Sequence, residues 1–348
     1  MKLFKGVNQA LLRYQNVSDR KWRIPPAIKI LPARDRTTIY YLSPAENAPS
    51  GGVKVIYRHV ELLNDMGIAA AVFHEEDGFS CDWFEHSAPV VSAKSLRFHA
   101  NDILVVPECY GYGLHTLPAQ IRKVIFNQGP HHTFDQIDFA ATAPGAPYRD
   151  VLNLEGILTV SEDGAELLHY AFPEIAVSIA RNVIDPINFK LRDEAAPHHI
   201  SYIPSRRQAE LGQIRHILRS SRVLDEGGWK IEPIIGRTES EMGDILRRSS
   251  IFMSLSDRDG FGLPPAEAMA TGCFVVGYAG GGGNEFFDAA YSRQVSDTTG
   301  MVREMLAAMN LSDREREEYG SKAAARIRNH YTQDGLRDDL DRFYGRIL

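Results

Sequence analysis

The sequence predicts an α/β protein built from two doubly wound, Rossmann-like domains that face each other across a cleft, with C-terminal helices packing back. Strand and helix signals alternate from residue 37 onward, which is typical of parallel sheets covered by helices. The strand signals are short, nearly continuous apolar runs, as expected for strands buried on both faces. At 348 residues the chain is also longer than one hydrophobic core usually supports.

The first series of elements begins with a β-branched and aromatic run at residues 38–42, which predicts a strand. Apolar residues at helical spacing from Val53 to Leu63 predict the next helix, with Gly67 as its C-cap. Ser161 predicts the N-cap of a helix that ends near Ala171. The other strands of this series are predicted at 69–73, 103–106, 124–126 and 157–160.

A second series follows residues 187–198, which lose periodicity and are rich in charge. Its strands are predicted at 200–203, 231–235, 251–255 and 274–276, and its helices at 207–219, 239–248 and 264–270. From about residue 298 the chain reads as helical and charged. The predicted organisation is a basic leader (1–36), an N-terminal domain (37–190) and a C-terminal domain (191–325). A last helix (326–348) follows, and its return to the N-terminal domain is one option.

Charge and cysteine content exclude several classes of protein. Thirty-nine basic against forty-five acidic residues give a net charge of −6, which argues against a protein that coats nucleic acid. Three cysteines, far apart, argue against a disulfide scaffold and fit a reducing cytoplasm. No stretch approaches the ~20 apolar residues of a membrane span. The leader carries nine Lys or Arg against two acids, so it is either solvated or a peripheral contact to anionic lipid headgroups.

Residues 254–285 carry the strongest chemical signal. After the strand 251–255, Gly260 and Gly262 allow the backbone to approach a ligand closely. Two prolines then begin a helix, whose N-terminal amides form an anion site. Asp259 lies in the loop and Glu267 in the predicted first turn of the helix; since 267 − 259 = 8, seven residues separate them. Such carboxylates can accept hydrogen bonds from vicinal hydroxyls of a sugar.

A second glycine run, Gly280 to Gly283, follows the strand 274–276 and precedes Glu285. It predicts another backbone cradle for an anion, with a flexible turn as the simpler alternative. Arg206 and Arg207 stand at a predicted helix start, where cations oppose the helix dipole, so an anionic ligand explains them better than chance surface charge.

The stretch DGFGLPPAEAMATGCFVV resembles the donor-site motif of retaining glycosyltransferases of the GT-B fold, notably family 4. In that family an acid, seven residues and a glutamate lie in the donor site. Three further segments resemble landmarks of the family: Ser50-Gly51-Gly52-Val53, Thr159-Val160-Ser161 and Arg181-Asn182-Val183-Ile184-Asp185. The resemblance spans about residues 37–290, with 254–285 as its specific part.

The resemblance implies a role for each matching residue. Glu267 would bind the ribose of a nucleotide, and Asp259 the hydroxyls of the donor sugar. Backbone amides of the loop would hold the sugar and its phosphate, at Gly260, Phe261, Gly262 and Leu263. Gly51 and Gly52 would form a glycine loop that lines the cleft from the other domain.

Two positions depart from the family pattern. Asp259 is one methylene shorter than the usual glutamate. The usual Arg and Lys of the first C-domain turn are replaced by Ser205-Arg206-Arg207, with no lysine after them. Either arginine offers a donor fork for a diphosphate, and the sequence leaves open which one binds it.

The N-terminal domain offers polar residues after two of its strands. Asn127 to His132 follow the strand 124–126, and His131 is our candidate catalytic or sugar-contacting histidine. A metal site at His131 and His132 is rejected, because adjacent residues do not point the same way. Glu108, Cys109 and Tyr110 follow the strand 103–106; they line the acceptor side or close a turn, and we favour the turn.

Together these observations predict a metal-free glycosyltransferase for glycan or glycoconjugate biosynthesis. It would move a hexose-type sugar from a UDP- or GDP-sugar to the hydroxyl of a glycan, lipid-linked or small-molecule acceptor, and the resemblance implies retention of the anomeric configuration. An inverting reaction would need a base, for which His131, His132 and Asp135 are candidates. A dehydrogenase is disfavoured because Ser50-Gly51-Gly52 lacks the G-x-G-x-x-G spacing. A non-catalytic glycan- or nucleotide-binding protein on a decayed transferase fold is the alternative from another class.

Overall fold

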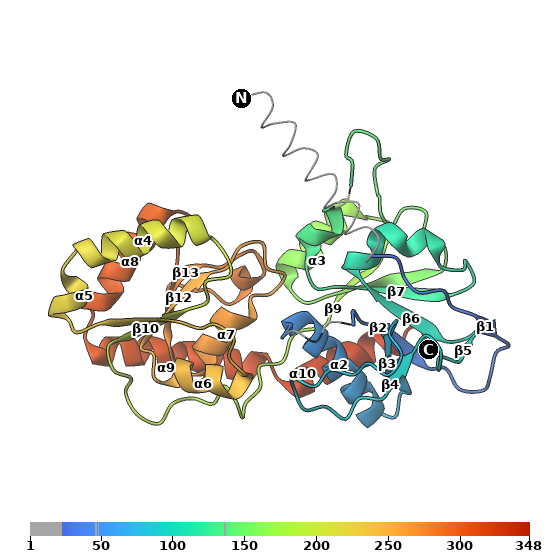
Figure 1. The fold of residues 1–348 in the computed structure, drawn as a ribbon, viewed down its shortest axis with the longest axis horizontal. Coiled ribbons are helices and arrows are strands. Elements are labelled where there is room, and N and C mark those ends of the chain that lie inside the picture. Colours follow the sequence, from blue (N-terminus) through green and yellow to red (C-terminus); the bar gives the residue numbers. More distant parts are fainter. Residues whose placement is uncertain (1–22, 46, 48, 136) are drawn as a thin grey trace. The chain divides into compact units, whose positions relative to one another are not determined.

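The computed structural model describes residues 23–45, 47, 49–135 and 137–348. The chain folds into two compact α/β units, and each takes a segment from beyond its main run (Figure 1). Unit 1 comprises the chain up to Thr159 together with Ala165–Ala180 and Asp339–Leu348. Unit 2 comprises Val160–Gly164 and Arg181–Asp338. The boundary between the units therefore falls inside one helix, α3 (Glu162–Ala171).

Unit 1 is built on a seven-stranded parallel sheet with the strand order β4-β3-β2-β6-β7-β8-β9. A separate two-stranded sheet joins β1 to β5. The elements of this unit before α3, with β9 after it, are β1 (Ile30–Leu31), β2 (Ile39–Leu42), α2 (Gly51–Asp65), β3 (Ala70–His74), β4 (Val90–Ser92), β5 (Phe98–His99), β6 (Ile103–Pro107), η1 (Glu108–Thr116), β7 (Arg122–Asn127), η2 (Pro130–Phe134), β8 (Leu154–Thr159) and β9 (Val177–Ile179).

The central strands of unit 1 confirm the sequence-based prediction, because each buried apolar run forms a strand of the sheet. Ser161 accepts a hydrogen bond from the Gly164 amide at 3.0 Å, as expected of the predicted N-cap of α3. The edge strands β4 and β9 were not predicted. Each has only three residues, and most of these are partly exposed, so neither carries a continuous apolar signal.

The expectation of a solvated leader through residue 36 is wrong for its described part. Ile28 is buried, and β1 pairs with β5. Arg34 pairs with the fully buried Asp102 at 3.1 Å, and the same carboxylate accepts the Thr38 amide at 2.8 Å. A few alternating apolar residues are enough to order this segment, because they pack on the core of unit 1 and do not have to form a core of their own. Residues 1–22 lie outside the described part, so the lipid contact stays a prediction.

Unit 2 is built on a five-stranded parallel sheet with the order β11-β10-β12-β13-β14. The segments of chain that continue from β9 are β10 (His199–Tyr202), α4 (Gln208–Ser220), α5 (Val223–Glu226), β11 (Lys230–Pro233), α6 (Glu239–Arg247), β12 (Ile251–Leu255), α7 (Leu263–Ala270), β13 (Phe274–Tyr278), η3 (Gly282–Glu285), β14 (Ser292–Gln294), α8 (Thr298–Asn310), α9 (Asp313–His330) and α10 (Gln333–Tyr344). The last six residues of α10 belong to unit 1.

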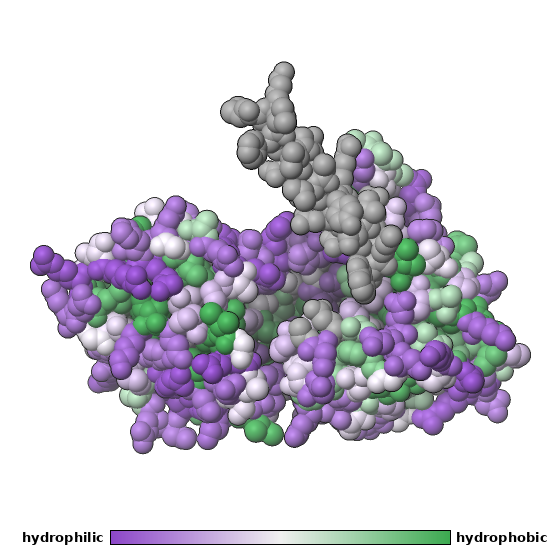
Figure 2. Space-filling view, in the orientation of Figure 1, coloured by the Kyte–Doolittle hydropathy of each residue, from purple (hydrophilic) through white to green (hydrophobic). Residues whose placement is uncertain are grey.

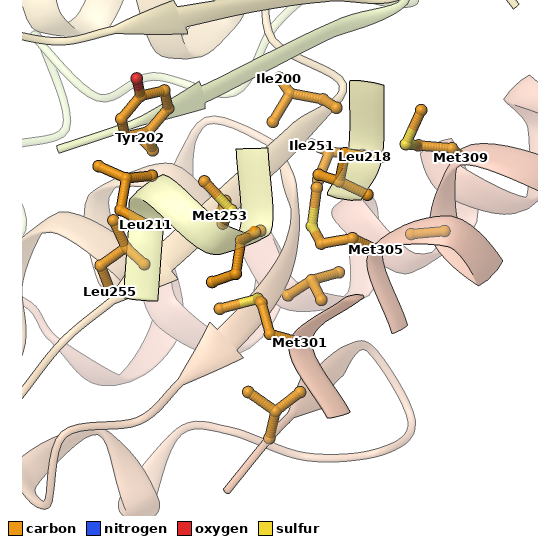
Figure 3. Packing of buried hydrophobic residues seen from close by; sticks show 14 of the residues in the cluster. Ile200, Tyr202, Leu211, Leu218, Ile251, Met253, Leu255, Met301, Met305 and Met309 are labelled. Carbon is orange, nitrogen blue, oxygen red and sulfur yellow. The ribbon is translucent and has the colours of Figure 1, made fainter. Parts of the chain in front are cut away.

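The core of unit 2 lies between its sheet and helices α4 and α8. Methionines at helical spacing on α8 (Met301, Met305 and Met309) pack against apolar residues of α4 and the strands (Figure 3). Flexible methionine side chains fill the irregular gaps between helix and sheet. Figure 2 shows mostly hydrophilic residues on the surface, with apolar residues in small patches. Within the described ranges, every helix is too short or too polar to cross a membrane.

Each sheet has one switch point, where neighbouring strands send the chain to opposite sides. In unit 1 this point lies between β2 and β6, and in unit 2 between β10 and β12. Ligands of open parallel sheets bind outside the carboxyl ends of such strands. Glu108 directly follows β6 in unit 1. In unit 2, Arg206 follows β10 and Asp259 follows β12.

Candidate functional site

The loop between β12 and α7 forms the centre of the candidate site in unit 2. Gly262 is the N-cap of α7 with φ +90°, a left-handed backbone that favours glycine. Leu263 is the first helical residue, and two prolines without amide hydrogens follow it. The amides at the helix start are therefore concentrated at Gly262 and Leu263, beside the positive end of the helix dipole. The predicted helix start is confirmed to within one residue.

The two acids of the motif occupy different positions relative to this helix. Asp259 lies in the loop with its side chain 21% exposed. Glu267 is the fifth residue of α7 and partly exposed. Its predicted place in the first turn is wrong: the helix starts at Leu263, before the prolines, so Glu267 lies in the second turn.

Arg206 and Asp259 form an ion pair across the switch point of unit 2. The Arg206 Nε lies 3.5 Å from the Asp259 Oδ1, and the arginine side chain is 52% exposed. Such a long, exposed contact leaves most of the guanidinium donors directed to solvent. Arg206 is thus able to receive an anion while it stays beside the carboxylate.

Arg207 is held within the protein on every side. Its Nε donates to the Ser256 carbonyl at 3.1 Å, and its two terminal nitrogens pair with Glu210 at 2.9 Å and Asp257 at 3.1 Å. The guanidinium also lies 3.8 Å from the ring centre of Tyr278. These contacts occupy the donor fork and tie the start of α4 to the loop after β12.

Glu210 completes this network from α4. It accepts hydrogen bonds from the Tyr278 hydroxyl at 2.5 Å and from the Thr298 hydroxyl at 3.3 Å. The Tyr278 hydrogen bond, with help from Arg207, holds the pKa of Glu210 below its ordinary value. Burial and the nearby Glu210 raise the pKa of Tyr278 to about 12. The sequence analysis missed this network because its members come from four separate elements.

The second glycine run packs against the first loop, backbone to backbone. The Gly282 amide donates to the Asp259 carbonyl at 3.0 Å, and Gly281 pairs with Asp259 in a parallel bridge. A Cβ on Gly282 would lie 2.1 Å from the Gly260 carbonyl oxygen, and one on Gly280 would lie 2.6 Å from the Ser256 Cβ. The glycines are thus needed for the close packing of the two loops. The sequence analysis had interpreted them as a second anion cradle or a flexible turn and had not considered this packing.

Phe261 and Glu285 connect these two loops to the rest of unit 2 through contacts with Tyr331. The Phe261 ring is 3% exposed and packs edge-on against Tyr331 at 4.9 Å, so only its backbone is available to a ligand. Glu285 accepts the Tyr331 hydroxyl at 2.7 Å and the Glu162 amide at 2.8 Å. Burial raises the pKa of Glu285. Through Glu285 the loop holds the first residues of α3, which belong to unit 2.

The polar residues of unit 1 gather at the carboxyl ends of its strands. Gly51 and Gly52 are the first two residues of α2, with Ser50 as N-cap, so the predicted glycine loop is instead a helix start. The Ser50 side chain, which accepts from Val53, makes that extension of the helix favourable. The Gln128 side-chain amide donates to the Gly52 carbonyl at 2.9 Å and ties this helix start to the end of β7.

The two histidines of unit 1 differ in environment. His131 is partly exposed in η2. The His132 Nδ1 lies 2.7 Å from the Asp135 carboxylate, and both side chains are exposed. A carboxylate on Nδ1 favours the tautomer whose Nε2 accepts a proton, which is the arrangement of a general base.

Glu108 is a site feature that the sequence analysis undervalued. It begins η1, so the predicted turn is present, but its carboxyl is largely surrounded by protein. Burial raises the pKa of Glu108 to about 7, against opposing effects of nearby amides and His132. The sequence did contain a signal for this site. Glu108 is an acid directly after a wholly apolar strand, at the sheet edge where Gln128 also lies.

The arrangement in unit 2 defines a class of ligand. A largely unpaired guanidinium, amides at a helix start and two partly exposed carboxylates suit a molecule that combines an anionic group with hydroxyls. A nucleoside diphosphate joined to a sugar has this chemistry.

Comparison with known proteins supports the same class. Residues 232–326 match the family described as Glycosyl transferases group 1. The chain is similar to an Alpha-1,6-glucosyltransferase of Actinobacillus pleuropneumoniae serotype 7, with 26% identity over 241 residues, which cover 66% of this chain and 69% of the relative.

Solved structures give the same fold at low identity. Sucrose-phosphate synthase from Thermosynechococcus elongatus matches with a TM-score of 0.63 and 12% identity, over 90% of this chain and 99% of that one. HepE from Anabaena, in complex with UDP and glucose, matches with a TM-score of 0.61 and 12% identity, over 89% and 100%. The chain is therefore a glycosyltransferase with the GT-B fold.

Proposed function

We propose that this glycosyltransferase moves a hexosyl group, with UDP-glucose as the first donor to test, to an acceptor hydroxyl in glycan or glycoconjugate biosynthesis. The pairing of Arg206 with Asp259 beside the start of α7 is the observation that carries the proposal. The choice of UDP over GDP is supported by HepE, which was solved with UDP and glucose. Glucose is also supported by the Actinobacillus relative.

Each group of unit 2 has a defined task in this proposal. Arg206 and the amides of Gly262 and Leu263 stabilise the negative charge that grows on the departing diphosphate. Asp259 accepts hydrogen bonds from hydroxyls of the donor sugar, and Glu267 accepts those of the ribose. Phe261 and Gly260 contribute backbone only.

The reaction is proposed to retain the anomeric configuration and to need no metal. The bond from the anomeric carbon to the diphosphate oxygen breaks as the bond to the acceptor oxygen forms on the same face. The acceptor proton passes to the leaving diphosphate. The transition state resembles an oxocarbenium ion, so charge stabilisation by Arg206 replaces much of what a cation would supply.

An inverting reaction is the second candidate, and the hydrogen bond between His132 and Asp135 favours it. In that case His132, oriented by Asp135, would take the acceptor proton. The anomeric configuration of the product, read by NMR, decides between the two mechanisms.

The donor site is tested by thermal shift with UDP, GDP, ADP, CMP and NAD. We expect a rise of the melting temperature with one nucleoside diphosphate, lost in Glu267→Ala and kept in the control Glu318→Ala, an exposed acid of α9. Transfer to a panel of glycan, lipid-linked and small-molecule acceptors follows with that donor. A shift with the diphosphate but no transfer to any acceptor and no donor hydrolysis would favour a non-catalytic binding protein instead.

A further inference from the structure

Glu108 stands at the switch point of unit 1, where its sheet would place a ligand. It is the first residue after β6, and its Oε2 accepts the backbone amide of Gln128 at 3.1 Å. Gln128 directly follows β7, the neighbour of β6. One carboxyl group thus joins the ends of two adjacent strands at the edge where parallel sheets bind their ligands.

The contact continues from Glu108 to the start of α2. The Gln128 backbone binds Glu108, and the Gln128 side chain donates to the Gly52 carbonyl at 2.9 Å. The segments after β2, β6 and β7 are therefore linked through two residues. The Glu108 carboxyl is thereby linked, through Gln128, to both the helix start and the loop that leads into η2.

Gly129 lies between the Glu108 carboxyl and a histidine of that loop. A Cβ at this position would lie 3.1 Å from the Glu108 Oε1 and 2.8 Å from the His132 Cδ2. The absence of a side chain at residue 129 thus lets the carboxyl approach the loop closely. His132 and Gly129 both act to stabilise the charged form of Glu108.

The other titratable groups around Glu108 are uncharged near neutral pH. Burial raises the pKa of Cys109 to about 12, and it raises the pKa of Tyr110 and Tyr148 as well. Cys109 and Tyr148 each sense the charge of Glu108. His132, with Asp135 bound to it at 2.7 Å, is the remaining titratable neighbour of Glu108.

The same edge carries buried polar atoms without a partner among the described residues. They are the Asn127 Oδ1, the Tyr148 hydroxyl and the Thr159 Oγ1, on side chains that are 0%, 1% and 0% exposed. Asn127 and Thr159 end β7 and β8. Unsatisfied polar groups are costly in a core, so their gathering at this edge is typical of a functional region.

We propose, building on the transfer reaction above, that Glu108 is a positioning residue whose carboxylate fixes the segment Gln128–His132 against the first turn of α2 on the acceptor side. The charged carboxylate accepts the Gln128 backbone amide more strongly than the protonated carboxyl, which has one fewer acceptor. Protonation therefore weakens the hydrogen bond that holds Gln128, the residue from which the loop with His131 and His132 continues. Because burial raises the pKa of Glu108 to about 7, this change falls within the working range of pH.

The variant Glu108→Gln tests the proposal, with Glu174→Gln, an exposed carboxyl of unit 1, as its matched control. In the wild-type enzyme we expect kcat/KM for the acceptor to rise between pH 6 and 8 with a midpoint at about 7. In Glu108→Gln this rise should vanish, with a value at pH 8 lower by roughly 10–100-fold. The thermal shift with UDP, which reports on unit 2, should be unchanged.

A stability measurement separates positioning from simple packing. The folded chain holds the Glu108 proton up to about pH 7, whereas an unfolded carboxyl loses it near 4.5, so the ionised form opposes folding increasingly as pH rises through this window. Relative to wild type, Glu108→Gln should therefore gain melting temperature from pH 5 to pH 8 while it loses activity. A packing residue would instead lose stability equally at both pH values.

Gly129→Ala offers a second route to the same state, because its Cβ would separate the carboxyl from His132. We expect the same loss of the pH-dependent rise, whereas Gly212→Ala, which meets open space, should behave as wild type. A Glu108→Gln enzyme with the wild-type pH profile would overturn this inference and leave the transfer reaction standing. Absence of transfer by the wild-type chain would instead overturn the proposed function itself.

Discussion

The switch points of the two units hold their acids in contrasting ways. In unit 2, Asp259 is partly exposed and lies 3.5 Å from the exposed Arg206. In unit 1, Glu108 is partly exposed as well, but its Oε2 accepts the backbone amide of Gln128 at 3.1 Å. An exposed ion pair can exchange partners with an incoming anion, whereas a carboxyl bound to a backbone amide fixes the backbone around it. The same topology thus gives one edge suited to a charged ligand and one suited to an uncharged hydroxyl.

The largest test of this contrast compares the two neighbouring arginines. We expect Arg206→Ala to lower kcat/KM by roughly 100–1,000-fold, the usual cost of removing one donor to a developing negative charge. Its melting temperature should stay at the wild-type value, since the side chain is exposed. Arg207→Ala should lower the melting temperature, because three hydrogen bonds and a ring contact are lost. Equal effects of Arg206→Ala and Arg207→Ala on kcat/KM and on melting temperature would contradict the separate roles of the two arginines.

The next test concerns the packing of the two glycine loops in unit 2. Gly282→Ala should destabilise the fold by about 3 kcal/mol, because the added methyl group has no room beside the Gly260 carbonyl. Gly283→Ala is the matched control, since its Cβ would meet its nearest neighbour at 3.4 Å. Chemical denaturation with and without UDP measures both effects. A Gly282→Ala protein of wild-type stability would show that the loops are not held in contact.

Acid stability probes the buried groups of unit 1. Burial lowers the pKa of His59 from 6.5 to about 3, so the unfolded chain binds a proton there that the folded chain does not. The stability from this group is complete above about pH 6.5 and is lost as the pH falls toward 3, by about 2 kcal/mol at pH 5. His59→Gln should flatten the dependence of unfolding free energy on pH, and the exposed His169→Gln should not.

The smallest expected effect lies on the surface of unit 2, away from the loops. Gly212 lies inside α4, and a Cβ there would meet nothing within 4 Å. Gly212→Ala should stabilise the protein by about 0.5–1 kcal/mol through the lower entropy of the unfolded chain. UDP binding should stay at the wild-type value, and a change would contradict the placement of Gly212 away from the Arg207–Glu210 contacts.

The sequence predicted the architecture well where burial is two-sided. Strands such as Ile251–Leu255 are buried at every residue, so both of their faces must be apolar and the run is recognisable in the sequence. Prediction failed at the three-residue edge strands, which pair with the main sheet, and at the segment around Ile28, which packs into the core next to the separate β1–β5 pair. Edge pairing depends on tertiary context rather than on local pattern.

At the candidate site, motif residues and supporting residues differed in how far they could be predicted. The glycines, the prolines and Asp259 are close in sequence, so local backbone chemistry brings them to one loop. The distinction between Arg206 and Arg207 required Tyr278 and Asp257, which lie far along the chain. Glu108 was visible as an acid after a strand, but its burial depends on how η1 and η2 fold over it.

The return of the last ten residues to unit 1 has a consequence for synthesis on the ribosome. Tyr344 is fully buried and shares a 2.8 Å hydrogen bond with the Tyr41 hydroxyl, and Phe343 packs near Gly156. Unit 1 is thus the first to emerge and the last able to close, while unit 2 can complete its sheet earlier. The apolar surface of unit 1 that these last residues cover therefore stays exposed while the whole of unit 2 is synthesised, and chaperones can bind it during that time. Pulse proteolysis of a purified chain truncated after Asp338 should cut unit 1 and spare unit 2.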